Sequence, residues 1–466
     1  MLVRILIFVF ASALVWGQAP AAPPDPDVAR ELAEMRAVIQ QLQQRVGELE
    51  ARLGPAAASG PARPAVVQAE AAQAAVPFQD QSSQDQSASS APATSNLLHG
   101  TSVSGLVDMY YDYNFNDPIG RVNRLRAYDV LSNAFSLNQA DVIFENAADP
   151  GNGKRWGARL DLQFGQATET LQGNAANELR PEVYQNIFQA YGTYVVPVGS
   201  GLTVDFGKWA SSIGFENNYS QDQINYSRSY WFNFLPYYHM GARVNYQLAK
   251  KLALNYWVVN GTEQTEPFND FKDELVGLVI QPNKNISWTV NYYLGQEHPN
   301  VELLPNSTNP DLPTLQGTPF LPIAYAPKGK LHIIDSYVSW QASPQWSFGL
   351  EADYVIERMY TNSYPQVTWG GAGYARYQIS PRVAIAGRAE YMSDGGLFSM
   401  TPQALKETTL TFEQRLHGGF LLREEYRRDF SNQPYFYTDL LGVLKREQNT
   451  ATLGVVWWFG PKKSPW

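Results

Sequence analysis

The chain has 466 residues, 35 of them basic and 44 acidic, so its formal net charge is −9. This balance excludes nucleic acid as an expected partner. The absence of cysteine removes disulfides and thiolate metal sites. Charged residues make up 17% of the chain and aromatic residues 13%. This composition indicates that part of the protein surface faces an apolar environment. The long apolar run at residues 5–16 is too short for a membrane-spanning helix, which needs roughly 20 residues.

The N-terminus has the pattern of an export signal. One basic residue precedes the apolar run, and the small residues Gly17 and Ala19 follow it. We predict a secretory signal peptide at residues 1–19. The chain is then expected to leave the cytoplasm.

Residues 28–53 repeat apolar side chains at alternating spacings of 4 and 3. Such a period of 3.5 predicts a coiled-coil helix, and therefore association of chains, although the seam itself does not choose between a dimer and a trimer. The alternative is an amphipathic helix that docks on its own domain. The predicted seam consists of Val28, Leu32, Met35, Ile39, Leu42, Val46, Leu49 and Leu53.

Residues 54–99 are dominated by Ala, Pro, Gln and Ser, a composition that predicts a disordered linker. From residue 100 to 460 the apolar period changes to two, as in 346–356, which predicts two-sided strands. Short turns alternate with long polar loops along this region, and one of these loops is expected near residues 394–406. We predict an all-β transmembrane barrel of about 16 antiparallel strands, with 14–18 possible, preceded by a short α-helical coiled coil and the disordered linker.

This pattern is typical of the outer membrane of Gram-negative bacteria, with the N-terminal rod in the periplasm and lipid around the barrel. Residues Phe206–Trp209, Ile213–Glu216, Asn225–Ser229 and Pro236–Arg243 resemble the β-barrel porin-2, OmpL-like family. The resemblance implies a porin whose loop 211–236 folds inward and narrows the channel. By analogy with sixteen-stranded porins, we expect a homo-oligomer, with a trimer favoured. The expected solutes are small, hydrophilic and passively diffusing.

Charged residues occupy the inward positions of the predicted strands. The early strands are mostly acidic, and five arginines cluster between 376 and 427, so a field across the lumen is expected. The alternative is that these charges pair along the wall. The candidates for channel lining or constriction are Lys208, Glu216, Arg228, Arg243, Asp108, Asp112, Glu351, Asp353, Arg376, Arg388, Arg415, Arg423 and Arg427.

Two other functions are alternatives to the porin. The protein could be an outer-membrane anchor whose rod contacts peptidoglycan, with pore activity secondary. An enzyme is not expected, because the five histidines stand in no catalytic or metal-binding spacing. We therefore expect no catalytic residue, no metal and no cofactor.

Overall fold

The computed structural model describes residues 100–460, except for 173–177, 179, 268, 299–300, 306–313, 316–317, 326–328 and 359–363. The predicted signal peptide, the coiled coil with its seam and the linker all lie outside the described residues. Among the described residues, no helix is both long and apolar enough to cross a membrane.

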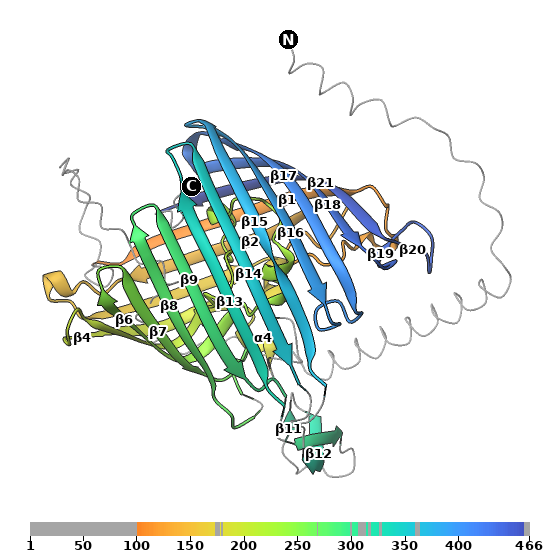
Figure 1. Cartoon of the computed structure of the whole chain (residues 1–466). Coiled ribbons are helices and arrows are strands. Elements are labelled where there is room, and N and C mark those ends of the chain that lie inside the picture. The colour runs from red at the N-terminus through yellow and green to blue at the C-terminus, as the bar shows by residue number, and fades with distance from the viewer. Residues whose placement is uncertain are drawn as a thin grey trace, which may run out of the picture. The chain divides into compact units, whose positions relative to one another are not determined.

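Sixteen antiparallel strands form a closed barrel in which neighbours in sequence are neighbours in space, apart from five short strands that belong to two excursions from the barrel. The first strand, β1 (Ser102–Asn114), pairs with the last, β21 (Glu447–Phe459), and this pairing closes the sheet (Figure 1). The other barrel strands are β2 (Ala134–Asn146), β3 (Trp156–Phe164), β4 (Ile187–Val196), β5 (Leu202–Ala210), β6 (Tyr238–Ala249), β7 (Leu252–Val259), β8 (Asp273–Asn283), β9 (Ile286–Gly295), β13 (Leu331–Gln341), β14 (Trp346–Glu357), β15 (Gln366–Ser380), β16 (Val383–Asp394), β17 (Gln403–Arg415) and β18 (Phe420–Ser431).

The remaining elements lie in the loops and turns that connect the barrel strands. They are α3 (Ala167–Gln172), α4 (Pro181–Tyr184), α5 (Tyr230–Phe234), β10 (Val301–Pro305), β11 (Thr314–Leu315), β12 (Thr318–Tyr325), β19 (Phe436–Tyr437) and β20 (Leu444–Lys445), with 3₁₀ turns η2 (Ile119–Arg121), η3 (Pro150–Asn152), η4 (Ser220–Asp222) and η5 (His417–Gly419). The strand count and the alternation of turns and loops confirm the predicted barrel.

One loop is shorter than expected. Residues 394–406 were predicted to be irregular, but β17 already begins at Gln403. The outward residues there, Lys406 and Thr408, are polar, whereas the inward Leu405 is buried. The usual alternation of apolar outside and polar inside is therefore lost near this end of the strand, which hides the strand in the sequence.

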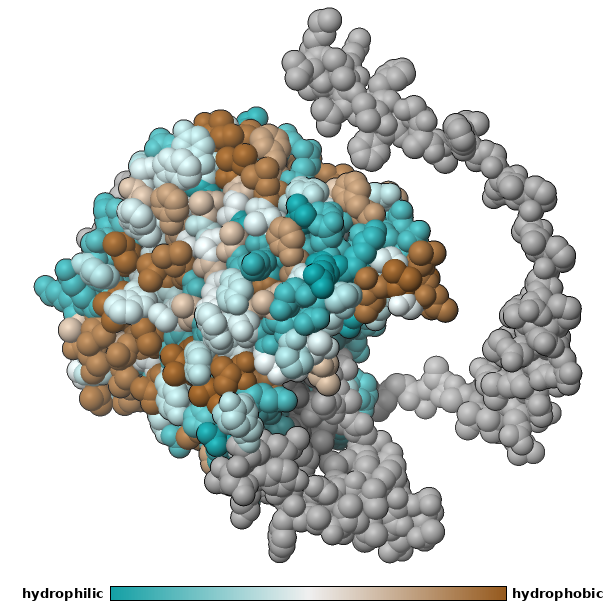
Figure 2. Space-filling model, turned by 45° about the vertical axis from the view of Figure 1, so that its right-hand side comes forward, coloured by the Kyte–Doolittle hydropathy of each residue, from teal (hydrophilic) through white to brown (hydrophobic). Residues whose placement is uncertain are grey.

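The barrel wall is apolar outside and polar inside. On β17 the outward Leu410 is 56% exposed and Phe412 36%, while the intervening Thr411 and Glu413 are buried. Hydrophobic side chains cover several patches of the outer surface (Figure 2). Since only closed barrels and helices satisfy their backbone hydrogen bonds in lipid, the outward stripe is the surface that faces the membrane.

The connection between β5 and β6, residues 211–237, folds inside the barrel; we call it the inner loop. Its only described α-helical turn, α5, is capped by Ser229, whose Oγ accepts from the backbone N–H of Phe232 at 2.9 Å. Trp231 and Leu235 join one apolar cluster with Trp209 of β5. The inner loop therefore has its own small core and is packed against the wall.

Candidate channel constriction

Three arginines of the wall hold the carbonyl groups of the inner loop. Arg388 on β16 donates to the Ser227 carbonyl at 2.7 Å, and Arg423 on β18 donates to the Ser220 carbonyl at 2.7 Å. Arg427, four residues further along β18, donates to the carbonyl of Arg228 at 2.5 Å. Buried carbonyls need partners, and these guanidinium groups supply them where no strand can.

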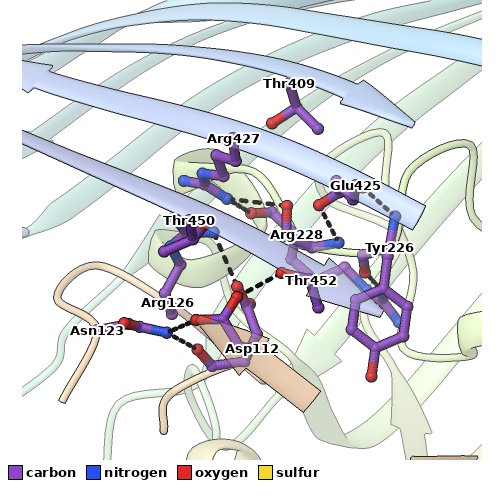
Figure 3. A network of polar contacts seen from close by, with 12 residues as sticks. Asp112, Asn123, Arg126, Tyr226, Arg228, Thr409, Glu425, Arg427, Thr450 and Thr452 are labelled. Carbon is purple, nitrogen blue, oxygen red and sulfur yellow. Dashed lines mark hydrogen bonds and ion pairs between the residues drawn. The ribbon is translucent and has the colours of Figure 1, made fainter. Parts of the chain in front are cut away.

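Carboxylates of the same wall bind the backbone N–H groups of the loop. Glu425 accepts from the N–H of Tyr226 at 2.6 Å and from that of Ser227 at 2.9 Å. Glu390 accepts from the N–H of Tyr230 at 2.9 Å. Figure 3 shows Glu425 and Arg427 reaching from β18 toward the loop residues Tyr226 and Arg228. The wall therefore holds residues 220–230 in two ways: its arginines donate to the loop carbonyls, and its glutamates accept from the loop N–H groups.

The same arginines are neutralised by ion pairs. Arg388 lies 2.8 Å from Glu407 of β17 and 2.8 Å from Glu216 of the inner loop. Arg423 lies 3.0 Å from Glu413, which also pairs with Arg376 at 2.6 Å. These side chains are buried, so each charge needs its oppositely charged partner to offset the cost of its removal from water.

Further charges extend this network along β17 and β18. Arg427 pairs with Asp429 at 2.8 Å, and Asp429 pairs at the same distance with Arg126 from the first loop. Arg415 pairs with Glu413 at 3.2 Å, and its side chain is 29% exposed. The five arginines of the predicted cluster are thus all in ion pairs.

The acidic residues of β1 bind loop side chains next to the arginine-rich strands. Asp108 accepts from the Ser220 hydroxyl at 2.6 Å and from the Tyr226 hydroxyl at 2.9 Å. Asp112 accepts from Asn123 of the first loop at 2.8 Å. The inner loop is consequently bound by one arc of the wall, in which only β21 separates the acidic strand β1 from the arginine-rich strands β16–β18.

Arg228 and Glu216 act within the loop. Arg228 donates to the carbonyls of Tyr226 and Asn218, each at 2.8 Å, and Glu216 accepts from the N–H of Ser229 at 2.7 Å. These contacts make the loop rigid rather than leaving its charges free.

The other candidates lie apart from this network. Arg243 pairs with Asp205 at 2.8 Å. Lys208, three residues beyond Asp205 and so on the opposite face of β5, lies 3.8 Å from the ring centroid of Tyr238. Glu351 accepts from the N–H of Phe215 at 2.8 Å at the start of the loop. Asp353 lies two residues after Glu351 on β14 and is also buried.

Three residues of the network were missed from the sequence. Glu407 and Asp429 stand two positions from Thr409 and Arg427, so extending the alternation by one step would have included them. Arg126 lies in an irregular loop, where no period marks the side chains that turn inward.

A cavity of about 410 Å³ lies beside the inner loop. Leu235, Ile333 and Val355 are among its apolar lining residues, and Glu263 is one of its carboxyls. Glu263 has a positive φ of 56°, an uncommon conformation for a residue with a side chain. Burial raises the pKa of Glu263 from 4.5 to about 8, while the N–H of Tyr237 and the charge of Lys208 act in the opposite direction.

This shift predicts a pH-dependent stability. The folded protein keeps the proton of Glu263 up to a pKa of about 8, whereas an unfolded chain releases it near 4.5. Stability is therefore expected to fall as the pH rises from about 5 to 8. The apparent unfolding temperature in detergent, measured across this range, should fall less in Glu263→Gln than in the wild type. Parallel pH profiles for the two proteins would contradict this assignment.

Comparison with known proteins gives the family. A family model described as "Putative beta-barrel porin-2, OmpL-like" matches residues 100–459. A search among curated proteins finds no match to the chain.

Among solved structures, an anion-selective porin from Comamonas acidovorans is 10% identical, with a TM-score of 0.49 over 77% of this chain and 99% of that one. OmpT, an outer membrane protein of Vibrio cholerae, is 10% identical, with a TM-score of 0.46 over 77% and 97%. The family model covers most of the sequence and the whole barrel. The chain belongs to the β-barrel porin-2, OmpL-like family.

Proposed function

We propose that the protein is an outer-membrane porin, a water-filled channel for passive diffusion of small hydrophilic solutes and ions. The family membership and the closed barrel with an apolar outer surface support this function. One observation carries it: the inward positions of the strands hold charged and polar side chains, which a dry core would not contain. Barrels of about sixteen strands are wide enough to enclose an aqueous channel.

The inner loop limits the width of this channel. It leaves the wall at β5 and β6 and is bound to β16–β18 and β1, which lie across the barrel from β5 and β6, so it crosses the interior rather than lying along one wall. The solutes that pass are therefore small. The paired charges along the loop provide an orienting field for dipolar solutes.

Single-channel recording tests the proposal. Purified, folded protein inserted into a planar bilayer should give stepwise, ohmic conductance in a salt solution. The heat-unfolded protein is the control and should give none. Folded protein that inserts without any conductance would contradict a porin function.

We further propose that the chain forms a homo-oligomer, with a trimer favoured, and that a periplasmic coiled coil at residues 28–53 strengthens it. The heptad seam supports this proposal. In the same recordings a trimer should close in three equal steps, and a variant lacking 28–53 should show a lower oligomer mass in detergent. Unchanged assembly would instead favour the second candidate, an anchor whose rod contacts peptidoglycan.

The proposed porin has no catalytic activity. The buried His239 supports this proposal, because one ring nitrogen lies 3.2 Å from the Ser211 hydroxyl and the other 3.2 Å from the carbonyl of Gly261. A catalytic pair of this kind needs a carboxylate to orient the imidazole and access for a substrate. His239 instead packs against the rings of Trp257 and Tyr293.

A further inference from the structure

Three carboxyl groups meet at the wall where the inner loop begins. Asp335 on β13 is the direct cross-strand partner of Asp353 on β14, and Glu351 lies two residues before Asp353 on the same face. All three are buried, and one oxygen of each lies within 4.8 Å of the others. Like charges directly opposite one another destabilise a sheet. This arrangement therefore needs a compensating group.

The described part of the chain supplies hydrogen bonds to Glu351 and Asp335 but no positive charge that would compensate the three carboxylates. None of the three carboxylates forms an ion pair there, although the arginines of the constriction are all paired. Asp353 is 4% exposed, and among the described residues no backbone N–H, amide, hydroxyl or basic side chain donates to its carboxylate oxygens. One oxygen of Asp335 also lacks a partner. A buried carboxylate without a partner is costly, so these oxygens are positioned for a ligand.

We propose that Asp335, Glu351 and Asp353 bind a divalent cation of the size of calcium. Carboxylate oxygens are the ligands that such hard cations prefer. Oxygens bound to one calcium ion at about 2.4 Å lie at most about 4.8 Å apart, and the three carboxylate oxygens lie within this limit. The site was not expected from the sequence, because its residues come from two strands and form no metal-binding spacing.

The proposed ion would fasten the start of the inner loop to the wall. Glu351 accepts from the N–H of Phe215, and the carbonyl of Ser212 accepts from the Tyr337 hydroxyl at 3.2 Å. Gly214 has a φ of 93°, and a Cβ there would lie 3.2 Å from the Oε1 of Glu351. The chain can pass this close to the carboxylates because the residue is glycine. The inference goes beyond the proposed function, since binding can be measured without any channel activity.

Terbium(III) is a suitable probe, because it binds at oxygen-rich calcium sites and its luminescence is sensitised by nearby tyrosine. Tyr374 donates to Glu351 at 3.2 Å. Full-length protein, refolded in detergent and stripped with chelator, should bind one more equivalent of Tb³⁺ than the Asp335→Asn/Asp353→Asn variant. Calcium should displace this equivalent. The matched control, Asp270→Asn at an exposed carboxylate, should bind as the wild type does.

Stability gives a second readout in case the variant folds poorly. Calcium should raise the apparent unfolding temperature of the wild type and leave that of Asp353→Asn unchanged. In chelator the single variant should be at least as stable as the wild type, since it has lost an uncompensated charge. Equal Tb³⁺ stoichiometry in the wild type and the double variant, or no effect of calcium on the wild type, would overturn the proposal. A proton shared by Asp335 and Asp353 would then be the compensating group.

Discussion

We expect the single-channel conductance to rise about twofold or more when residues 218–229 are replaced by a short Gly/Ser link. The reason is that this segment occupies the interior of a barrel that is otherwise wide enough for water. The barrel should still fold, since its strand pairs do not involve the inner loop. Its apparent unfolding temperature should fall, because Arg388, Arg423 and Glu425 lose their backbone partners.

A deletion of the same length in another loop controls for the loss of chain. Residues 434–445 include β19 and β20 at the rim of the barrel (Figure 1). Their removal should leave the conductance within the scatter of the wild type. An excised inner loop that leaves the conductance unchanged would show that this loop does not limit the channel.

The Arg388→Gln/Arg423→Gln variant should lose more stability than any other exchange of two charges in the wall. Both arginines are buried, and each joins a carboxylate of the wall to a carbonyl of the loop. Removing one partner of a buried pair costs about 3–5 kcal/mol, because the other charge stays behind without compensation. The measurement is the unfolding temperature in detergent and, where unfolding is reversible, the free energy of unfolding.

The same variant should shift the reversal potential toward cation selectivity, more at low salt than at high salt. It leaves Glu407 and Glu413 with fewer positive neighbours, and bulk salt screens charges in a confined space poorly. Arg415→Gln is the matched control, because Arg415 also pairs with Glu413 but is partly exposed. Its effect on stability should be near the 0–1 kcal/mol that is usual for exposed pairs. Equal effects of the two exchanges would contradict the role given to the buried arginines.

The barrel could be predicted because its evidence is local. A period of two, together with alternating turns and loops, marks each strand without knowledge of its neighbours. Counting these turns and loops predicts the sixteen strands that the barrel has. The same alternation gave the inward side of β17 and β18. It failed at Gln403–Lys406, where the outward side chains are polar and strand and loop look alike.

The contacts of the constriction could not be predicted, because they depend on the path of the inner loop. Arg388 and Glu216 are separated by 172 residues, and no pattern in either segment specifies their pairing. The family resemblance implied that the loop turns inward but not which wall would bind it. The carboxylate cluster was hidden for a similar reason: Asp335 and Asp353 become neighbours only through the register of β13 with β14.

The position of the inner loop is the central claim, and cross-linking tests it most directly. The Nδ2 of Asn225 donates to the Oγ1 of Thr411 on β17 at 2.7 Å. Since the chain has no cysteine, Asn225→Cys/Thr411→Cys offers a single pair to a short bifunctional thiol reagent. We predict rapid cross-linking in the folded protein and the same conductance before and after it. Failure to cross-link, or a conductance that changes severalfold when the loop is tied to β17, would contradict the account.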